Sequence, residues 1–409
     1  MADQDMVAIQ FRDKAYSFPA AALGGTKEAP KLKPADELLL NWALAIITGA
    51  GYAPAALAPS PAERVGEGGG RGQTLQTANL LHDHYGVLTT CLPIASKAFC
   101  SDNVLHLHRM HAIFSANHGD ETPLPPAVDI VTEALPTAPL NLLHLPKSLD
   151  LFEIYLLKVA ATSGPTTRLA AAFQTRHFTP RMLATAAKYA NTVSQSRAYK
   201  KARLLLLSDF KKPEKITLPQ HELEFAGKTY RQFYGVFSAK QIDLATRFLL
   251  EEWARNPSLT ELPVPKNILD IGCGNGIIGD QLLMRYPEAH LVATDVSRLA
   301  LASAQQNYQV ARPQVLTELV ERVQWTDRVD DLPAAPFDLI VTNPPFHDGH
   351  RNTIGTSLGL FRQVEKILST GGHFIIVANR HLNYATHLRR LFPTVKTLAE
   401  NRKFVIYCC

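Results

Sequence analysis

The stretch NILDIGCGNGIIG, residues 267 to 279, decides the fold of this chain. Its first residues are typical of a short buried strand, and its last apolar residues begin a helix. Between them Gly272, Gly274 and Gly276 let the backbone turn tightly and approach a ligand without obstruction from a Cβ atom. Asp295 ends the next apolar run, 19 residues after Gly276 (295 − 276 = 19), where a carboxylate can accept ribose hydroxyl groups. The pattern predicts a cofactor site at a strand end.

The glycine spacing leaves the type of cofactor open. Gly274, Gly276 and Gly279 also fit the dinucleotide fingerprint, so NAD binding is an alternative, as is a turn that merely packs the fold. Asp270, directly before the glycines, would place a negative charge beside a pyrophosphate. The same carboxylate suits a cofactor that carries an ammonium and a sulfonium group, and a second motif supports this choice.

The second motif is Asn343-Pro344-Pro345-Phe346, which follows the apolar run FDLIVT. The Asn343 side chain and the Pro344 carbonyl can accept the hydrogens of a planar exocyclic amine and aim its nitrogen at an electrophilic methyl group. Phe346 can stack on the base that carries the amine. Taken alone, the motif also fits a proline-stiffened loop after a core strand.

The second half of the chain alternates short apolar runs with helix-like stretches. The runs are NILDIG, LVATD, RVQWTD, FDLIVTN, HFIIVAN and KFVIYCC. This alternation predicts an α/β domain with a mostly parallel, doubly wound sheet and a ligand crevice at the carboxyl ends of its strands.

The first half echoes the same order of elements. LNLLHLPK, the helical LDLFEIYLLKVAATS, TRLAAAFQTRHF and YKKARLLLLSD run in parallel with the later segments, which indicates a duplicated domain or a chance likeness between two α/β halves. We expect one domain over residues 1–215 and a second over residues 216–409, with a short hairpin linker within residues 208–234.

The glycine motif, Asp295 and NPPF resemble the motifs of class I S-adenosylmethionine-dependent methyltransferases. YGVFSAKQIDLATRFLL (residues 234–250), NPPFHDGH, IIVANRHLNYATHLRRLF and NRKFVIY are similar to the bacterial ribosomal RNA guanine-N2 methyltransferases of the C/G type, and to the large-subunit branch most closely. The resemblance implies two Rossmann-like class I methyltransferase domains, an N-terminal one that is degenerate and binds RNA and a C-terminal one that is catalytic.

The resemblance also implies roles for individual residues. S-adenosyl-L-methionine is the expected cofactor, with Asp295 on its ribose and Asp327, near Asp330 and Asp331, on its adenine. The cofactor-binding residues would be Asp270, Gly272, Gly274, Asn275, Gly276, Asp295 and Asp327. Asn343, Pro344 and Phe346 would receive a guanine of 23S rRNA.

Composition narrows the class of protein. The 409 residues are 46% hydrophobic and carry a net charge of +5, which permits a polyanionic partner without requiring one. The five cysteines show no metal-ligand spacing, and the sequence has no secretory signal, so we expect a cytoplasmic protein. No apolar run reaches about 18 residues, so we expect a protein that does not span a membrane. A monomer is expected.

Two polar clusters have a structural and a functional interpretation. The basic residues Arg197, Lys200, Lys201 and Arg203 form either a solvated face or a contact with RNA phosphates. The histidines at 82, 84, 106, 108 and 111 invite a metal interpretation, but no Cys or carboxylate joins them at ligand spacing. Alternating histidines in a strand-like run are typical of partly solvated surface, so we predict no metal site. Residues 48–72, rich in Ala, Pro and Gly, are expected to form a flexible loop.

Four alternative functions remain at this stage. Guanine-N2 methylation of 16S rRNA is the nearest. Glutamine methylation of release factors also uses an Asn-Pro-Pro-aromatic loop, but a short helical leader would then be expected in place of the α/β first half. A nicotinamide oxidoreductase leaves NPPF unexplained, and a noncatalytic RNA-binding assembly factor leaves both motifs unused.

Overall fold

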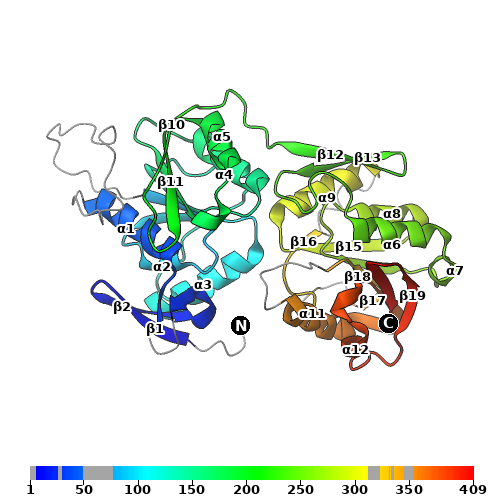
Figure 1. Ribbon diagram of the computed structural model, residues 1–409. Coiled ribbons are helices and arrows are strands. Elements are labelled where there is room, and N and C mark those ends of the chain that lie inside the picture. The colour runs from blue at the N-terminus through cyan, green and yellow to red at the C-terminus, as the bar shows by residue number, and fades with distance from the viewer. Residues whose placement is uncertain are drawn as a thin grey trace. The chain divides into compact units, whose positions relative to one another are not determined.

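The computed structural model describes residues 6–25, 30–48, 77–311, 323–330, 332, 336–344 and 353–409. The chain divides into two compact units, Met1–Leu218 and Pro219–Cys409, each built on a seven-stranded sheet (Figure 1). The sequence predicts the boundary between residues 215 and 216. Most of the Ala/Pro/Gly-rich segment, Asp331, Pro345 and Phe346 lie outside the described residues.

The sheet of the second unit has the strand order β16-β15-β14-β17-β18-β20-β19. Its strands are β14 (Asn267–Ile271), β15 (His290–Asp295), β16 (Val323–Trp325), β17 (Phe337–Thr342), β18 (Leu368–Asn379), β19 (Lys396–Glu400) and β20 (Phe404–Cys408). The first five in spatial order are parallel, and β20 is antiparallel to both of its neighbours. The chain leaves β14 toward β15 on one side and returns to β17 on the other, which makes the end of β14 a topological switch point.

Helices cover both faces of this sheet, because its central strands are apolar on both sides. Ile268 packs in a core with α6 (Leu244–Arg255), α8 (Ile277–Arg285) and α9 (Arg298–Ala311), whereas the next residue, Leu269, packs with α11 (Thr353–Ile367) and α12 (Ala385–Leu388). Figure 1 shows these two helical layers on opposite sides of the strands. The short helix α7 (Pro257–Thr260) follows α6. The predicted α/β sandwich is confirmed.

The hairpin expected as a linker belongs to the second unit. Its strands β12 (Gln220–Phe225) and β13 (Lys228–Phe233) are antiparallel. The backbone N–H of Arg231 donates to Asn307 Oδ1 at 3.0 Å, and that of Phe233 donates to Ser303 Oγ at 3.0 Å. Both acceptors lie on α9, so the hairpin is packed on this helix and is more than a connection.

The sheet of the first unit has the order β10-β11-β9-β8-β5-β6-β7. Its strands are β5 (Thr77–Leu81), β6 (Ser96–Cys100), β7 (Ala127–Val128), β8 (Leu140–His144), β9 (Arg168–Gln174), β10 (Ala190–Gln195) and β11 (Ala202–Phe210). Read from its other end, this order repeats that of the second sheet, with β5 in the place of β14 and β8 in the place of β17. The two antiparallel strands at one edge are repeated as well. The duplicated architecture is therefore confirmed.

The remaining elements of the first unit are helices and the strands of two separate two-stranded sheets. They are α1 (Pro34–Thr48), α2 (Val87–Cys91), α3 (Val104–His118), α4 (Leu149–Ala161), α5 (Pro180–Tyr189) and the short strands β1 (Met6–Phe11), β2 (Lys14–Pro19), β3 (Leu23–Gly25) and β4 (Pro30–Leu32). The strand-like interpretation of the histidines at 106, 108 and 111 is wrong, because all three lie on α3. Among the described helices, none is long and apolar enough to cross a membrane.

Candidate active site

The glycine motif forms the turn from β14 into α8, and its glycines have two different tasks. Gly272 and Gly274 have left-handed φ angles of 70° and 55°, and a Cβ atom added to either would meet nothing within 4 Å. At Gly276 an added Cβ would lie 2.9 Å from Ala304 Cβ, and at Gly279 it would lie 2.5 Å from Tyr308 Oη. The first pair therefore borders open space, and the second pair lets α8 approach α9.

Asp270 lies at the floor of this turn and is fully buried. Its Oδ2 accepts a hydrogen bond from the Gly279 N–H at 3.0 Å, whereas its Oδ1 is buried and has no hydrogen-bond partner among the described residues. Burial, opposed by the Gly279 N–H and reinforced by the charge of Asp295, raises the pKa of Asp270 to about 7. A buried carboxylate oxygen without a partner is an acceptor for a cationic ligand group.

Asp295 ends β15 beside the glycine turn. Its Oδ2 accepts from the Gly274 N–H at 2.9 Å and its Oδ1 from the Ser297 N–H at 2.8 Å, which fixes the carboxylate plane. Each oxygen keeps a second lone pair, so the group can still accept ribose hydroxyls. Burial raises the pKa of Asp295, although these backbone N–H groups work in the opposite direction.

Asp327, the expected adenine ligand, lies two residues beyond the end of β16, which pairs with β15. Its competitor Asp330 is engaged in ion pairs with Arg328, at 3.6 Å, and with Lys366, at 3.5 Å. Asp330 Oδ1 is also buried without a hydrogen-bond partner among the described residues, so the choice of Asp327 as the adenine ligand stays a prediction. The other competitor, Asp331, lies outside the described residues.

Asn275 is buried and ties the glycine turn to the hairpin. Its Nδ2 donates to Gln232 Oε1 at 2.9 Å, and its Oδ1 accepts from the Ile277 N–H at 3.2 Å. Gln232 Nε2 in turn donates to the carbonyls of Val236 and Phe237, at 3.5 and 3.3 Å. The structure therefore gives the Asn275 side chain a positioning task, and direct contact of Asn275 with the cofactor stays a prediction. No local sequence pattern marks Gln232 as part of the site, because only the fold brings it to Asn275.

Asn343 follows β17 at the same edge of the sheet. Its Nδ2 donates to Asp243 Oδ2 at 3.0 Å and to Thr246 Oγ1 at 2.9 Å. The Asp243 carboxylate also caps α6 by accepting from the Ala245 and Thr246 N–H groups. Because a carboxylate only accepts hydrogen bonds, it fixes the amide orientation and leaves Asn343 Oδ1 buried without a partner among the described residues. Pro344, the next residue, is buried.

The basic cluster lies in the first unit, where its members differ. Lys200 Nζ is 3.1 Å from Glu37 Oε2, and Tyr199 donates to the same carboxylate. Arg197, Lys200 and Lys201 are exposed, whereas Arg203 is half-buried. Because Lys200 is paired with Glu37, Arg197 and Lys201 are the exposed cations of the cluster that are best placed to meet a polyanion.

The residues present fit the cofactor that the resemblance implies. The unpaired Oδ1 of Asp270 can accept from an ammonium group, the glycines border open space, and the Asp295 carboxylate is fixed at the end of the neighbouring strand. The described residues thus provide a cradle at the switch point of the sheet.

Comparison with known proteins agrees with this geometry. The Methyltransferase small domain family matches residues 228–408, and the RLMG N-terminal domain family matches residues 69–215. A solved T. thermophilus 16S rRNA N2 methyltransferase, in complex with AdoMet and guanosine, covers 99% of this chain and 97% of its own with a TM-score of 0.68 and 20% identity. At that identity the likeness shows the fold alone.

Two curated relatives share more sequence. The ribosomal RNA large subunit methyltransferase G of Aeromonas salmonicida is 31% identical over 80% of this chain and 85% of its own length. The protein of the same name from Klebsiella pneumoniae subsp. pneumoniae is 32% identical, again over 80% of this chain and 85% of its own. The chain therefore belongs to the ribosomal RNA large subunit methyltransferase G family.

Proposed function

We propose that this chain transfers a methyl group from S-adenosylmethionine to the exocyclic N2 amine of a guanine in large-subunit rRNA. Membership of the family supports three parts of this proposal: the methyltransferase activity, the cofactor and an rRNA substrate. The choice of large-subunit rRNA follows the names of the relatives in the family. An rRNA substrate is consistent with the cytoplasmic location that the sequence predicts.

The proposal that an amine receives the methyl group rests on one observation: Asn343 Oδ1 has no hydrogen-bond partner among the described residues. Asp243 and Thr246 hold the Nδ2 end of the amide, so Oδ1 is directed away from them and can accept a hydrogen from a planar amine. A second hydrogen would go to the Pro344 carbonyl. Two such acceptors hold the amine so that its nitrogen faces the donor of the methyl group.

When bound, S-adenosylmethionine supplies a methyl group on a sulfonium, whose sulfur leaves as a neutral thioether. The chain's own residues therefore position the amine more than they deprotonate it. Asp270 is anchored by the Gly279 N–H and Asp295 by the Gly274 N–H, so both carboxylates are held without further rearrangement.

The decisive experiment transfers a radiolabelled methyl group onto rRNA from a strain that lacks the protein. Separated 23S and 16S rRNA are compared, each both naked and within its assembled subunit, and the product nucleoside is identified by mass spectrometry. We expect labelled N2-methylguanine in 23S rRNA. Label in 16S rRNA, or on another atom of the base, would contradict the proposed substrate.

Asn343→Ala tests the assigned mechanism. We expect methyl transfer to fall by about 100-fold or more, because the amine loses one of its acceptors, while calorimetry with S-adenosylmethionine gives an unchanged affinity. Thr246→Ser is the matched control, because it keeps the hydroxyl that orients the amide, and it should retain activity. Full activity of Asn343→Ala would refute the role of this residue. If wild-type protein failed to bind S-adenosylmethionine, a noncatalytic assembly factor would be the better hypothesis.

A further inference from the structure

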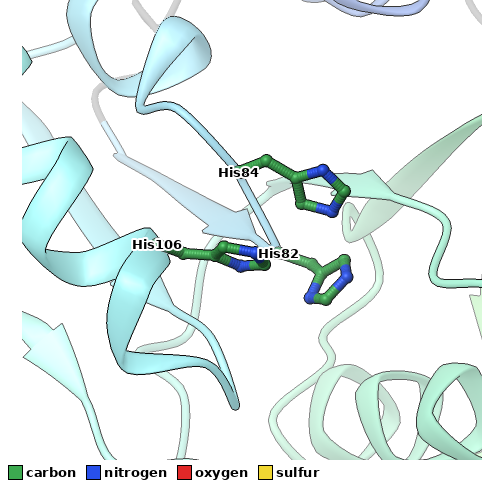
Figure 2. Close-up of side chains that lie close together, drawn as sticks. All are labelled: His82, His84 and His106. Carbon is green, nitrogen blue, oxygen red and sulfur yellow. The ribbon is translucent and has the colours of Figure 1, made fainter. Parts of the chain in front are cut away.

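Three histidines of the first unit gather at one point, although the sequence interpretation treats them as surface residues. One ring nitrogen from each of His82, His84 and His106 lies within 4.8 Å of the others. The ring centroids are 4.6, 4.8 and 4.5 Å apart, and His82 and His106 are buried. Figure 2 shows the three rings together, with His106 carried by helix α3 and the other two by the segment after β5.

The cluster occupies the place that the cofactor turn occupies in the second unit. In the second unit Ile271 of β14 pairs with Thr342, and in the first Leu81 of β5 pairs with Leu143. His82 follows β5 as Gly272 follows β14, and their φ angles of 55° and 70° are both left-handed. In the same register His84 takes the place of Gly274. Imidazole rings thus stand where the second unit keeps open space.

The correspondence extends across the crevice to His144. This residue follows β8 as Asn343 follows β17, and its Nε2 lies 2.7 Å from Asp36 Oδ1, as Asn343 is held by Asp243. Burial works against a charge on His144, but Asp36 and then Asp83 raise its pKa overall. At these positions the first unit therefore also has a side chain held by an aspartate, but it has histidines where the second unit has glycines.

Second contacts orient two of the three rings. His106 Nδ1 lies 2.8 Å from Ser101 Oγ, and His82 Nδ1 lies 3.4 Å from Tyr155 Oη. In the tautomer that carries its proton on Nδ1, each ring donates to the hydroxyl, and Nε2 is the ring nitrogen that keeps a lone pair for a metal ion. A hydrogen bond from the second ring nitrogen is the usual way in which proteins orient a histidine that binds a metal.

Burial and the close approach of the other rings disfavour a positive charge on His82 and His106. Burial, followed by the charges of neighbouring histidines, lowers the pKa of His82 and His106 well below the ordinary value. A shared cation could accept a lone pair from one ring nitrogen of each residue, because these nitrogens lie within 4.8 Å of one another.

We propose that His82, His84 and His106 form a site for a divalent transition-metal ion of the zinc class in the degenerate crevice of the first unit. A three-histidine set suits Zn²⁺, with a water molecule in the fourth position. Tetrahedral ligands at about 2.0–2.1 Å from the ion lie roughly 3.4 Å apart, so the rings must draw together by small rotamer changes. This inference is independent of the proposed methyl transfer.

The test uses the full chain without a histidine tag, after treatment with a chelator. Zn²⁺ alone is titrated in a calorimeter, and Co²⁺ is added in a separate sample to record its visible absorption, which reports the ligand number. We expect one Zn²⁺ per chain, and a Co²⁺ spectrum of a four-coordinate site. Absence of saturable binding of Zn²⁺ would overturn the proposal.

Variants localise the ion. His84→Ala and His82→Asn should each lower the affinity for Zn²⁺ by about 100-fold or more, and asparagine tolerates the left-handed backbone at position 82. His108→Ala is the matched control, because His108 lies exposed on the same helix as His106 and outside the cluster. Circular dichroism and unchanged binding of S-adenosylmethionine verify that the variants fold. If the variants bind Zn²⁺ as tightly as the wild type, the ion lies elsewhere and the site is refuted.

Discussion

At the residue scale, Asp270 and Asn343 share one feature. Each has one polar atom anchored by neighbours and one oxygen that is buried without a partner among the described residues. An unsatisfied buried polar group costs about 1–3 kcal/mol of stability. Both oxygens belong to side chains at the carboxyl edge of the second sheet, on neighbouring strands. A ligand that carries hydrogen-bond donors would remove this cost, so the cost is best explained by binding.

Asp270 should make cofactor binding depend on pH. Because burial raises its pKa to about 7, the carboxylate that attracts an ammonium group is fully formed only above that pH. We expect the affinity of the chain for S-adenosylmethionine to rise between pH 6 and pH 8. Asp270→Asn should weaken binding by about 10- to 150-fold at pH 8, the equivalent of about 1.5–3 kcal/mol for a charged hydrogen bond, and should remove this pH dependence. Calorimetry across the pH range measures both effects.

The stability of the cofactor-free chain should change in the opposite direction. The pKa of Asp270 is higher in the folded chain than its ordinary value of 3.8, so its contribution favours folding at low pH and is lost as the pH rises through about 7. Urea unfolding of the wild type and of Asp270→Asn at several pH values isolates this contribution. Parallel pH profiles for the two proteins would show that Asp270 does not titrate in this range.

The sequence predicts Asn343 but not the residues that orient it. Asn343 was found because it ends an apolar run beside two prolines. Asp243 and Thr246 precede it by about a hundred residues, and only folding brings the start of α6 against the end of β17. In the same way the sequence treats the glycines as one group, whereas their two tasks depend on what packs opposite each of them.

At the element scale, the close approach of α8 to α9 depends on Gly279. A Cβ atom there would lie 2.5 Å from Tyr308 Oη, 2.8 Å from Leu291 Cδ2 and 3.2 Å from Asp270 Oδ2. We expect Gly279→Ala to lower the free energy of unfolding by about 1–3 kcal/mol, because α8 must move away from its neighbours. Denaturant unfolding measures the change.

Gly359→Ala is the matched control for this prediction. Gly359 lies in the interior of α11, and an added Cβ atom would meet nothing within 4 Å. The same substitution should therefore raise the free energy of unfolding, by about 0.5–1 kcal/mol, because alanine restricts the unfolded chain more than glycine does. Equal effects of the two substitutions would contradict the packing argument.

The predicted elements fail where the local pattern is weak. The buried strands β14, β15, β17 and β20 were predicted because apolar residues dominate them. Strand β19 was missed, since KTLAE is polar and pairs only with β20 at the edge of the sheet. The histidines of α3 were assigned to a strand because their alternation imitates period two. Their convergence with His82 and His84 depends on tertiary packing, which spacing along the chain does not encode.

At the scale of the whole molecule, the two units share one strand order but have different residues at corresponding positions. The second unit keeps a crevice bordered by glycines, and the first fills the corresponding place with imidazole rings and adds an exposed basic segment. Side chains at Gly272 and Gly274 would enter the open space that a cofactor needs, so we expect His82 and His84 to keep the first unit from binding a second cofactor. Binding of rRNA by the first unit stays a prediction.

The exposed cations of the first unit should account for part of the affinity for rRNA. Lys200 is already paired with Glu37, so Arg197 and Lys201 are the members of the basic cluster that can neutralise phosphates. For Arg197→Ala combined with Lys201→Ala, we expect weaker binding to any rRNA sequence. The dependence of log affinity on log salt should become shallower by about 1.4–1.8, the release of two counterion contacts. Filter binding at several salt concentrations measures this slope.

Lys188→Ala is the control for this prediction. Lys188 is paired with Glu153 at 2.8 Å, so its substitution should change the slope much less. An unchanged slope in the double variant would place the RNA contact elsewhere, while unchanged affinity for S-adenosylmethionine would verify that the second unit is intact.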